Sequence, residues 1–344
     1  MKIHGLMVLC VASIASPLAM ADAAAGMAAY QRGDYVTALR ELSVAARAGE
    51  PAAKSGLAMM YEHGRGVPRD DQKAATLFRE AAEGGAADGA SNLGTMYLAG
   101  RGVPQDDAQA LKWFEKAAAQ GNDAAQNNLG FMYQNGRGVA ADQRAAFDWY
   151  LKAAKQGLSP AEWSVALFYQ SGQGGVALDD GIAIDWLQKA ASQGFAPAQY
   201  ELAAHFYSGR AGSITRDEAM SWLVKAAEQD HPDALNNLGA MYITGQGVAK
   251  DPGKAIALFR KNAEKGFPNA LSALAHAYSE GIGVPKDLVV ACAIYSMASQ
   301  RGAEQAVARR DQIRTQLTPD QRARADALAE NWSPGKQLPD APAH

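Results

Sequence analysis

Histidine and cysteine are the first side chains to examine for catalysis or metal binding in this 344-residue chain. Beyond the N-terminal segment, no two histidines have the spacing of metal ligands on one helix; they are His63, His205, His231, His276 and His344. Cys292 lies in "VVACAIYSMA" with apolar neighbours at helical spacing, which is typical of a small core residue. Neither residue type therefore indicates a metal site or a nucleophile.

Ser333 and Lys336 form a Ser-x-x-Lys sequence, the nucleophile pattern of penicillin-recognising enzymes. In those enzymes the serine opens a helix, and Ser-Asp-Asn and Lys-Thr-Gly elements complete the site. Here Pro334 and Gly335 lie inside the motif, and the companion elements are absent from the sequence. We interpret the match as chance.

Paired aspartates could act as a general acid and a general base. They recur at Asp70-Asp71, Asp106-Asp107 and Asp179-Asp180. Their regular spacing favours helix caps over an acid/base pair, because each pair precedes an amphipathic segment. We therefore predict no catalytic residue, no metal ligand and no cofactor, and a protein that is not an enzyme.

The regular spacing of the acids belongs to a longer internal repeat. "YEHGRGVPRDDQKAATLF" is followed 36 residues later by "YLAGRGVPQDDAQALKWF", and an Ala-Ala-x-x-Gly ending closes the first four copies. Seven full repeats run over residues 50–302. The first glycine of the turn falls at Gly64, Gly100, Gly136, Gly172, Gly209, Gly245 and Gly281.

Each repeat reads as two helices joined by a glycine-rich turn. Leu93 and Tyr97 share one face of the first helix, and Leu111 and Phe114 share one face of the second. Two glycines two residues apart supply the positive φ angles of a reversal. A phosphate-binding loop would need a preceding strand and a following Lys-Ser/Thr, and the sequence has neither. The turn is therefore structural, and valine at Gly66 or Gly102 should destabilise it by about 1–3 kcal/mol.

The motif "LGxMYxxGRGV", the Ala-Ala-x-x-Gly ending and the 36-residue period resemble the Sel-one-like repeat (SLR) family, a relative of the tetratricopeptide repeat. The resemblance implies an all-α fold, a right-handed α-solenoid of tandem helix-turn-helix repeats. Residues 22–49 resemble a tetratricopeptide-like half-repeat that forms an N-terminal cap. We expect C-terminal capping helices over 303–332, with a capping box at Thr318, and a disordered Pro-rich tail over 333–344.

A cysteine-rich branch of the SLR family is linked to penicillin binding and β-lactamase activity. Its members carry a cysteine pair in each repeat, and the repeats of this chain contain only Cys292. That activity is therefore not carried over to this chain.

The N-terminus reads as a signal peptide over residues 1–21. Lys2 precedes an apolar stretch too short to span a bilayer, and Ala19-Met20-Ala21 fits a cleavage site after Ala21. We expect a periplasmic or secreted protein without a transmembrane segment once the signal is removed. The formal net charge of −3 argues against a nucleic-acid partner.

The first helix of each repeat also presents a stripe of residues on the face opposite the leucine and tyrosine that recur in the repeats. Positions two before and two after the leucine lie on that opposite face, which lines the concave groove in tetratricopeptide-like arrays. The predicted partner-binding groove comprises Ser91, Thr95, Asn127, Phe131, Trp163, Leu167, Tyr200, Asn236 and His276. Alternatively, the bulky members of the stripe pack on the neighbouring repeat.

The favoured function is a non-enzymatic scaffold that mediates protein–protein interactions in the cell envelope through this groove. SLR proteins commonly act as adaptors, which supports a protein or peptide partner. A cell-wall glycan or polysaccharide-binding module is the alternative, since aromatic side chains also stack on sugars. A β-lactamase-like or cell-wall hydrolase is the least favoured reading. The sequence leaves the oligomeric state open.

Overall fold

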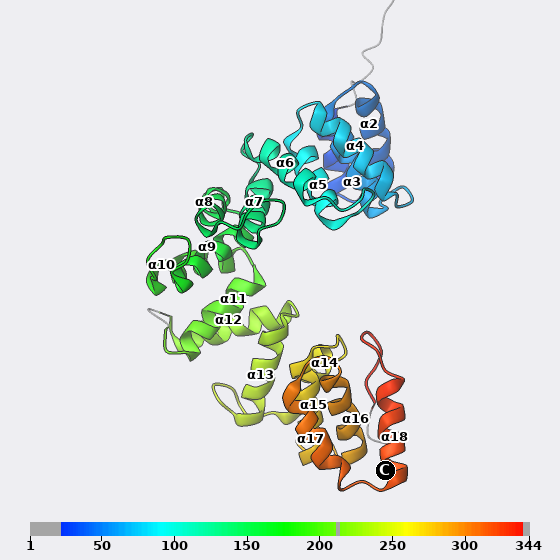
Figure 1. The fold of residues 1–344 in the computed structure, drawn as a ribbon, viewed down its shortest axis with the longest axis vertical. Helices are drawn as coiled ribbons and strands as arrows, with labels where there is room; N and C mark the ends of the chain where they lie inside the picture. The colour runs from blue at the N-terminus through cyan, green and yellow to red at the C-terminus, as the bar shows by residue number, and fades with distance from the viewer. Residues whose placement is uncertain (1–21, 211–213, 340–344) are drawn as a thin grey trace, which may run out of the picture. The chain divides into compact units, whose positions relative to one another are not determined.

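A computed structural model describes residues 22–210 and 214–339 of the chain (Figure 1). The predicted signal peptide of residues 1–21 lies outside these described residues. Every regular element within them is a helix. None of these helices is long and apolar enough to cross a membrane.

The chain divides between Gln156 and Gly157 into two compact units, unit 1 and unit 2. Unit 1 contains α1 (Ala23–Gln31), α2 (Tyr35–Arg47), α3 (Pro51–His63), α4 (Asp71–Glu83), α5 (Ala87–Ala99), α6 (Asp107–Ala118), α7 (Asp123–Asn135) and α8 (Gln143–Ala154). Unit 2 contains α9 (Ser159–Ser171), α10 (Asp180–Ser192), α11 (Ala196–Tyr207), α12 (Arg216–Glu228), α13 (Pro232–Thr244), α14 (Pro252–Ala263), α15 (Pro268–Glu280), α16 (Leu288–Ser299), α17 (Glu304–Arg314) and α18 (Pro319–Glu330).

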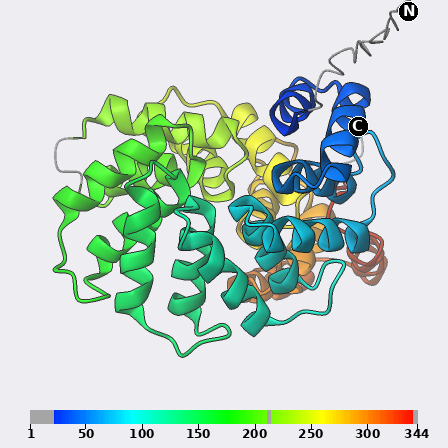
Figure 2. The ribbon, with the colours of Figure 1, turned by 90° about the horizontal axis from the view of Figure 1, so that it is seen from above.

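Within each unit, helices pack in chain order as tandem pairs. In unit 1, α3 packs on α4, α4 on α5 and α5 on α6, and the first helices α3 and α5 also touch each other. Figure 2 shows consecutive helices of a unit lying side by side. This all-helical tandem-repeat solenoid confirms the predicted fold class.

Residues 22–49, the segment predicted to form an N-terminal cap, fold as two helices, α1 and α2. The Asp22 carboxylate caps α1, and the two helices are joined by a short turn in which Gly33 has φ 79°. Tyr30 and Leu42 are buried between them and the following helix α3.

The core of each repeat lies between its two helices. Leu93 and Met96 of α5 and Phe114 of α6 are completely buried. The ring of Phe114 lies directly over Gly94, where a Cβ atom would come within 2.7 Å of ring carbon Cε1. The glycine of the "NLGTMY" motif thus makes room for the aromatic residue of the second helix.

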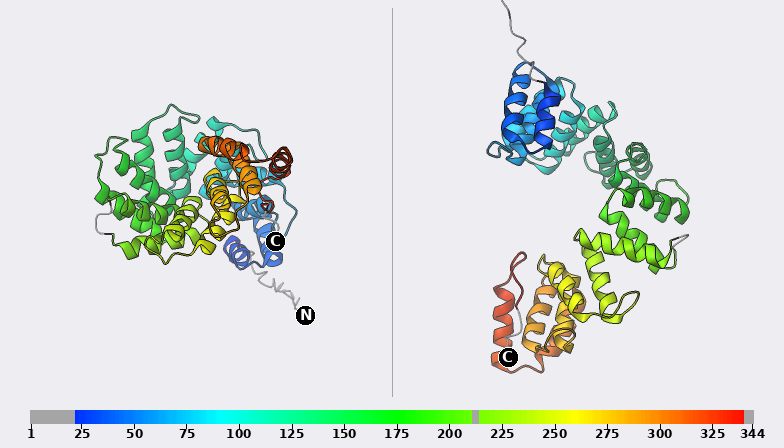
Figure 3. Two further views of the ribbon diagram at one scale, coloured as in Figure 1. Left: turned by 90° about the horizontal axis from the view of Figure 1, so that it is seen from below. Right: turned by 180° about the vertical axis from the view of Figure 1, so that it is seen from behind.

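The last two helices close the array as predicted. Figure 3 shows α18, in red, beside the orange α16, against which it packs. Thr318 and Gln321 form the predicted capping box at the start of α18. These helices give the final repeat a neighbour on the side where the motif ends.

Residues 333–339 are packed, which corrects the prediction of a disordered tail for that part of 333–344. Leu338 is buried, and the Gly335 N–H donates to the Glu264 carbonyl at 2.7 Å. The Trp332 Nε1–H donates to the Lys336 carbonyl at 2.9 Å, and the Arg301 guanidinium lies over the Trp332 ring. Two buried apolar side chains outweigh the Pro- and Gly-rich composition on which the prediction rested. Residues 340–344 lie outside the described residues.

Candidate functional site

The glycine-rich turns have the conformation that the sequence predicts. Gly100 ends α5 with φ 65°, and Gly102 has φ 66° two residues later. Gly136 and Gly138 repeat this geometry after α7. Positive φ at both positions reverses the chain. Glycine adopts this conformation without the steric strain that any other residue would have.

The second glycine of the turn also lies against the preceding repeat, a role that φ alone does not reveal. A Cβ atom at Gly102 would be 2.0 Å from the Asp71 main-chain oxygen, and one at Gly138 would be 2.5 Å from that of Asp107. Asp71 and Asp107 are the first residues of α4 and α6, the second helices of the preceding repeats. In unit 2, Gly283 meets the first residue of α14 in the same way. These three turns therefore dock on the start of the previous second helix.

In two turns the arginine that follows the first glycine forms an ion pair with the first residue of the previous second helix. Arg137 donates to both carboxylate oxygens of Asp107, at 2.9 and 2.6 Å, and Arg210 donates to both of Asp180, at 3.1 and 2.5 Å. Hydrogen bonds from each guanidinium hold the pKa of its aspartate below the usual value. The groups are about one-third exposed, so each pair contributes about 1 kcal/mol or less while fixing the orientation of the turn.

The paired aspartates have two separate structural roles. The first member is an N-cap: the Asp106 carboxylate accepts the Gln109 N–H at 3.0 Å. The second, Asp107, accepts from the arginine of the next turn. The cap interpretation is confirmed for the first aspartate. The second joins an ion pair with the next turn at Asp107 and Asp180. Asp71 instead pairs with Arg69 of its own repeat.

A signal for these ion pairs is present in the sequence but was missed. The arginine follows its acid by 30 residues, in Arg137 with Asp107 and in Arg210 with Asp180. Where the turn instead carries Ile282, the residue 30 positions earlier is Pro252. The spacing alone is not decisive, because Arg101 also follows Asp71 by 30 residues but donates to Glu62 at 2.6 Å.

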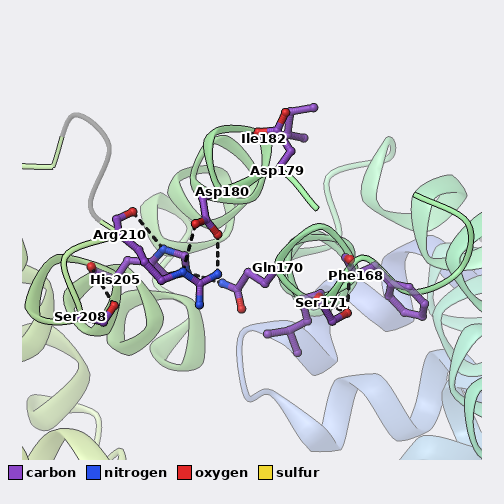
Figure 4. Close-up of polar contacts among 10 residues, drawn as sticks. Phe168, Gln170, Ser171, Asp179, Asp180, Ile182, His205, Ser208 and Arg210 are labelled. Carbon is purple, nitrogen blue, oxygen red and sulfur yellow. Dashed lines mark hydrogen bonds and ion pairs between the residues drawn. The ribbon is translucent and has the colours of Figure 1, made fainter. Parts of the chain in front are cut away.

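His205 lies in a polar cluster that joins α9, α10 and the turn after α11 (Figure 4). Its Nε2 is 2.6 Å from the Gln170 amide nitrogen and its Nδ1 is 3.4 Å from the Arg210 carbonyl oxygen. These contacts assign the proton to Nδ1, with Nε2 accepting from the Gln170 amide. Burial lowers the pKa of His205, which keeps the imidazole neutral. The Ser208 hydroxyl donates to the His205 carbonyl and not to the ring, so the imidazole does not activate it.

The other candidates for chemistry also have structural surroundings. Ser333 lies in a turn after α18 instead of opening a helix, and the Lys336 ammonium donates to the Asn331 carbonyl at 3.2 Å. Cys292 is completely buried, and burial raises the pKa of its thiol. Across residues 22–210 and 214–339, no three His, Cys, Asp or Glu side chains are grouped to hold a metal ion.

The unit 1 part of the predicted groove is mixed in exposure. Ser91 is 95 % buried between helices, and its carbonyl accepts the Thr95 hydroxyl at 3.2 Å, which removes Ser91 from an accessible surface. Phe131 is 38 % exposed. Asn127 is half-buried, and its Oδ1 is itself inaccessible and accepts no hydrogen bond from the described residues. Phe131, one turn further along α7, is therefore the member of unit 1 best placed to meet a partner.

The unit 2 part of the groove contains two aromatic pairs in successive repeats. The Trp163 ring lies edge-to-face on Phe195 with centroids 6.0 Å apart, and the Tyr200 ring stacks on His231 at 4.8 Å. Phe195 and His231 precede the first helix of the next repeat as its N-cap residue. Trp163 and Tyr200 are half-buried. The bulky stripe residues thus pack on the neighbouring repeat, as the alternative held, and still keep part of each ring exposed.

The remaining stripe residues of unit 2 differ from one another. Leu167 is half-buried beside Trp163 on α9. Asn236 points inward, where its Oδ1 accepts from the buried Asn262 amide at 2.9 Å. His276 is exposed and lines a cavity at the end of the array.

A series of tryptophan–lysine pairs on the second helices was also missed. The Lys Nζ lies between 3.7 and 5.2 Å from the centre of the tryptophan ring, in Trp113–Lys116, Trp149–Lys152, Trp186–Lys189 and Trp222–Lys225. The signal was Trp-x-x-Lys directly before Ala-Ala, in four successive repeats. Cation–π pairs of this kind contribute about 0.5–1 kcal/mol at exposed sites.

Glu162 is a buried carboxyl at a position where other repeats have glutamine. Gln126 and Gln199 occupy this position in two other repeats, and each accepts a hydrogen bond from a glutamine amide at 2.8 Å. Glu162 likewise accepts from Gln193 at 2.8 Å, and it is 4 % exposed. Burial raises its pKa above the usual value despite the attraction of Lys189 and this hydrogen bond.

Glu162→Gln is expected to stabilise unit 2 by about 1 kcal/mol at neutral pH, because it removes a buried charge and keeps the hydrogen-bond partner. A folded-state pKa above the unfolded value means that the native protein loses stability as pH rises through that range. The advantage of the variant should therefore vanish below about pH 4.5. Thermal melting at several pH values measures it. Glu218→Gln is the control, since hydrogen bonds from Thr215 lower the pKa of that carboxyl and its replacement should not stabilise.

The Sel1 repeat family model matches seven consecutive segments of the chain. They are residues 51–85, 87–122, 123–158, 159–195, 196–231, 232–267 and 268–302. They coincide with the helix pairs from α3–α4 to α15–α16. No curated protein matches the chain.

Several solved structures resemble the chain. A Sel1 repeat protein from Oxalobacter formigenes is 29% identical, with a TM-score of 0.63 over 70% of this chain and 96% of its own. A protective antigen of uropathogenic Escherichia coli with an SLR fold is 28% identical over 90% of this chain and 82% of its own, with a TM-score of 0.45. An immunity protein from Pseudomonas aeruginosa is 22% identical over 60% and 82%, with a TM-score of 0.43.

Proposed function

Because the chain belongs to the Sel1 repeat family, we propose that it is a non-enzymatic scaffold that binds a partner protein in the periplasm or outside the cell. The signal-like sequence of residues 1–21 supports the location. The structural contacts of the paired acids, His205, Cys292 and Lys336 support a role in binding rather than catalysis. The favoured role is that of an adaptor in the cell envelope.

The two aromatic pairs of unit 2 are the observation that carries this proposal. Trp163 with Phe195 and Tyr200 with His231 recur at equivalent positions of successive repeats. Half-buried rings that are held by a neighbour offer apolar contact area and lose little side-chain freedom when a partner binds. An extended segment of a partner protein, with side chains that reach successive repeats, fits such a periodic surface.

Trp163→Ala and Tyr200→Ala are expected to reduce retention of the partner by about 30-fold, because truncating an aromatic anchor typically costs 2 kcal/mol or more of affinity. Each variant should melt near the wild-type temperature, since both rings are only half-buried. Pull-down from envelope extract, followed by titration of the captured partner, measures the effect. Trp186→Ala and Trp222→Ala remove rings from the second helices and should leave retention unchanged.

Two other outcomes would contradict this proposal. A large fall in melting temperature with unchanged retention would place Trp163 and Tyr200 in the core only. The second outcome is retention on purified cell wall, with no captured protein and with retention lost in the Trp163→Ala and Tyr200→Ala variants. That result would identify a glycan-binding module.

A further inference from the structure

A cavity of about 530 Å³ lies at the C-terminal end of the repeats in unit 2. It is enclosed by the first and second helices of the last repeat and by the start of α17. Its lining includes Asn269, Ser272, His276, Tyr295, Ala303 and Arg309. Two of these residues, Ser272 and His276, belong to the exposed stripe on first helices, so the cavity opens on the same kind of surface as the aromatic pairs.

The cavity lies where the last repeat has no aromatic pair. Ser272 has the register of Trp163 and Tyr200, and Ala303 has the register of Phe195 and His231, as N-cap of the next first helix. In the two earlier repeats these positions hold two rings in contact. In the last repeat these positions hold only the small side chains of Ser272 and Ala303. The cavity therefore lies at the register that the aromatic pairs fill in the repeats of Trp163 and Tyr200.

The walls combine apolar and hydrogen-bonding groups. Ala306 and the ring of Tyr295 are almost completely buried and provide apolar contact. Among the described residues, no hydrogen bond or ion pair is formed by the Arg309 guanidinium or the His276 ring. Glu304 also lines the cavity, so its charge offsets that of Arg309. Such a wall favours an uncharged ring with a polar group over a carboxylate or an ammonium ion.

We propose that this cavity binds a tyrosine side chain of the partner's extended segment. The ring takes the place of the missing aromatic pair between Ser272 and Ala303, and the phenol hydroxyl bonds to groups such as Arg309 or His276. This inference deepens the proposed function and rests on it, because it assigns one anchor of the same partner to the last repeat.

N-acetyl-tyrosinamide is the probe, and the methyl resonance of Ala306 in the full chain, observed by NMR, is the readout. We expect saturable shifts with a dissociation constant of roughly 1 mM for a ligand of this size. N-acetyl-phenylalaninamide should bind at least fivefold more weakly, and N-acetyl-leucinamide should give no saturable shift. Equal binding of all three probes would overturn the proposal.

Ala303→Phe tests the geometry without threatening the fold, because phenylalanine already occupies this register at Phe195 and Phe267. The variant should melt at or above the wild-type temperature and lose the tyrosine-dependent shifts. Arg309→Ala should weaken binding about fivefold, whereas Arg310→Ala, whose side chain lines a different cavity, should not. Undiminished binding by Ala303→Phe would overturn the proposal.

The failure of this inference is distinguishable from failure of the proposed function. Partner retention that depends on Trp163 and Tyr200 but survives Ala303→Phe would leave the scaffold in place and remove the tyrosine site. Probe binding without any retained partner would do the reverse.

Discussion

Gly102→Ala is expected to lower the free energy of unfolding of unit 1 by about 2–5 kcal/mol, because the contact with the preceding repeat adds to the cost of about 1–3 kcal/mol expected from the turn conformation alone. Alanine at a φ of 66° carries backbone strain of roughly 1–2 kcal/mol. The new methyl group would also lie 2.0 Å from the Asp71 carbonyl oxygen, which forces the turn away from α4 at a further cost of about 1–3 kcal/mol. Denaturant unfolding followed by circular dichroism measures the sum.

Gly85→Ala is the matched control for this prediction. Gly85 has φ 97°, and no atom lies within 4 Å of the position that its Cβ would take. Only the backbone strain remains, so the loss should be roughly 1–2 kcal/mol. Equal losses at Gly85 and Gly102 would show that the turn does not need to touch the preceding repeat.

Phe114→Ala is expected to cost unit 1 about 3–5 kcal/mol of stability. The ring is completely buried, and it lies against Gly94, which has no side chain that could fill the space. The loss therefore includes both the transfer of the ring from water and the cavity that it leaves. Phe131→Ala, at a ring that is 38 % exposed, should cost less than about 1 kcal/mol.

The pairing of Gly94 with Phe114 also makes a second-site prediction. Gly94→Leu alone should destabilise by about 1–3 kcal/mol, because its Cβ would lie 2.7 Å from the ring. In the Phe114→Ala background the leucine has room, so the double variant should be at least about 1 kcal/mol more stable than Phe114→Ala. Simple addition of the two losses would contradict the contact.

The fold was predictable from the sequence because the same short-range pattern recurs seven times. The 36-residue period, the glycine-rich turns and the capping aspartates are local signals. Each recurs often enough to be recognised although individual repeats differ in sequence. The packed tail after Trp332 was not predictable in this way. Its order depends on the burial of Leu338 and on contacts with other elements, which a single copy of a sequence does not reveal.

The candidate surface was predictable only in outline. Helical periodicity placed Trp163 and Tyr200 on one face, and this could be read from residue numbers alone. It could not show that Asn236 turns inward to Asn262, or that Ser91 is buried between helices. The exposure of each stripe residue depends on the size of the side chains that face it from the neighbouring helices. The packing of the helices in three dimensions decides this.

The turns at Gly102, Gly138 and Gly283 contact residues that precede them in the chain, and this has a consequence for biosynthesis. Arg137, for example, binds Asp107 of the preceding repeat, 30 residues earlier in the chain. A ribosome makes the acceptor before the group that docks on it, so within a unit each new helix pair meets a finished surface. Chain growth and array growth thus run in the same direction, and contacts of such short range allow fast folding. No repeat within a unit has to wait, exposed, for a distant part of the sequence to be translated.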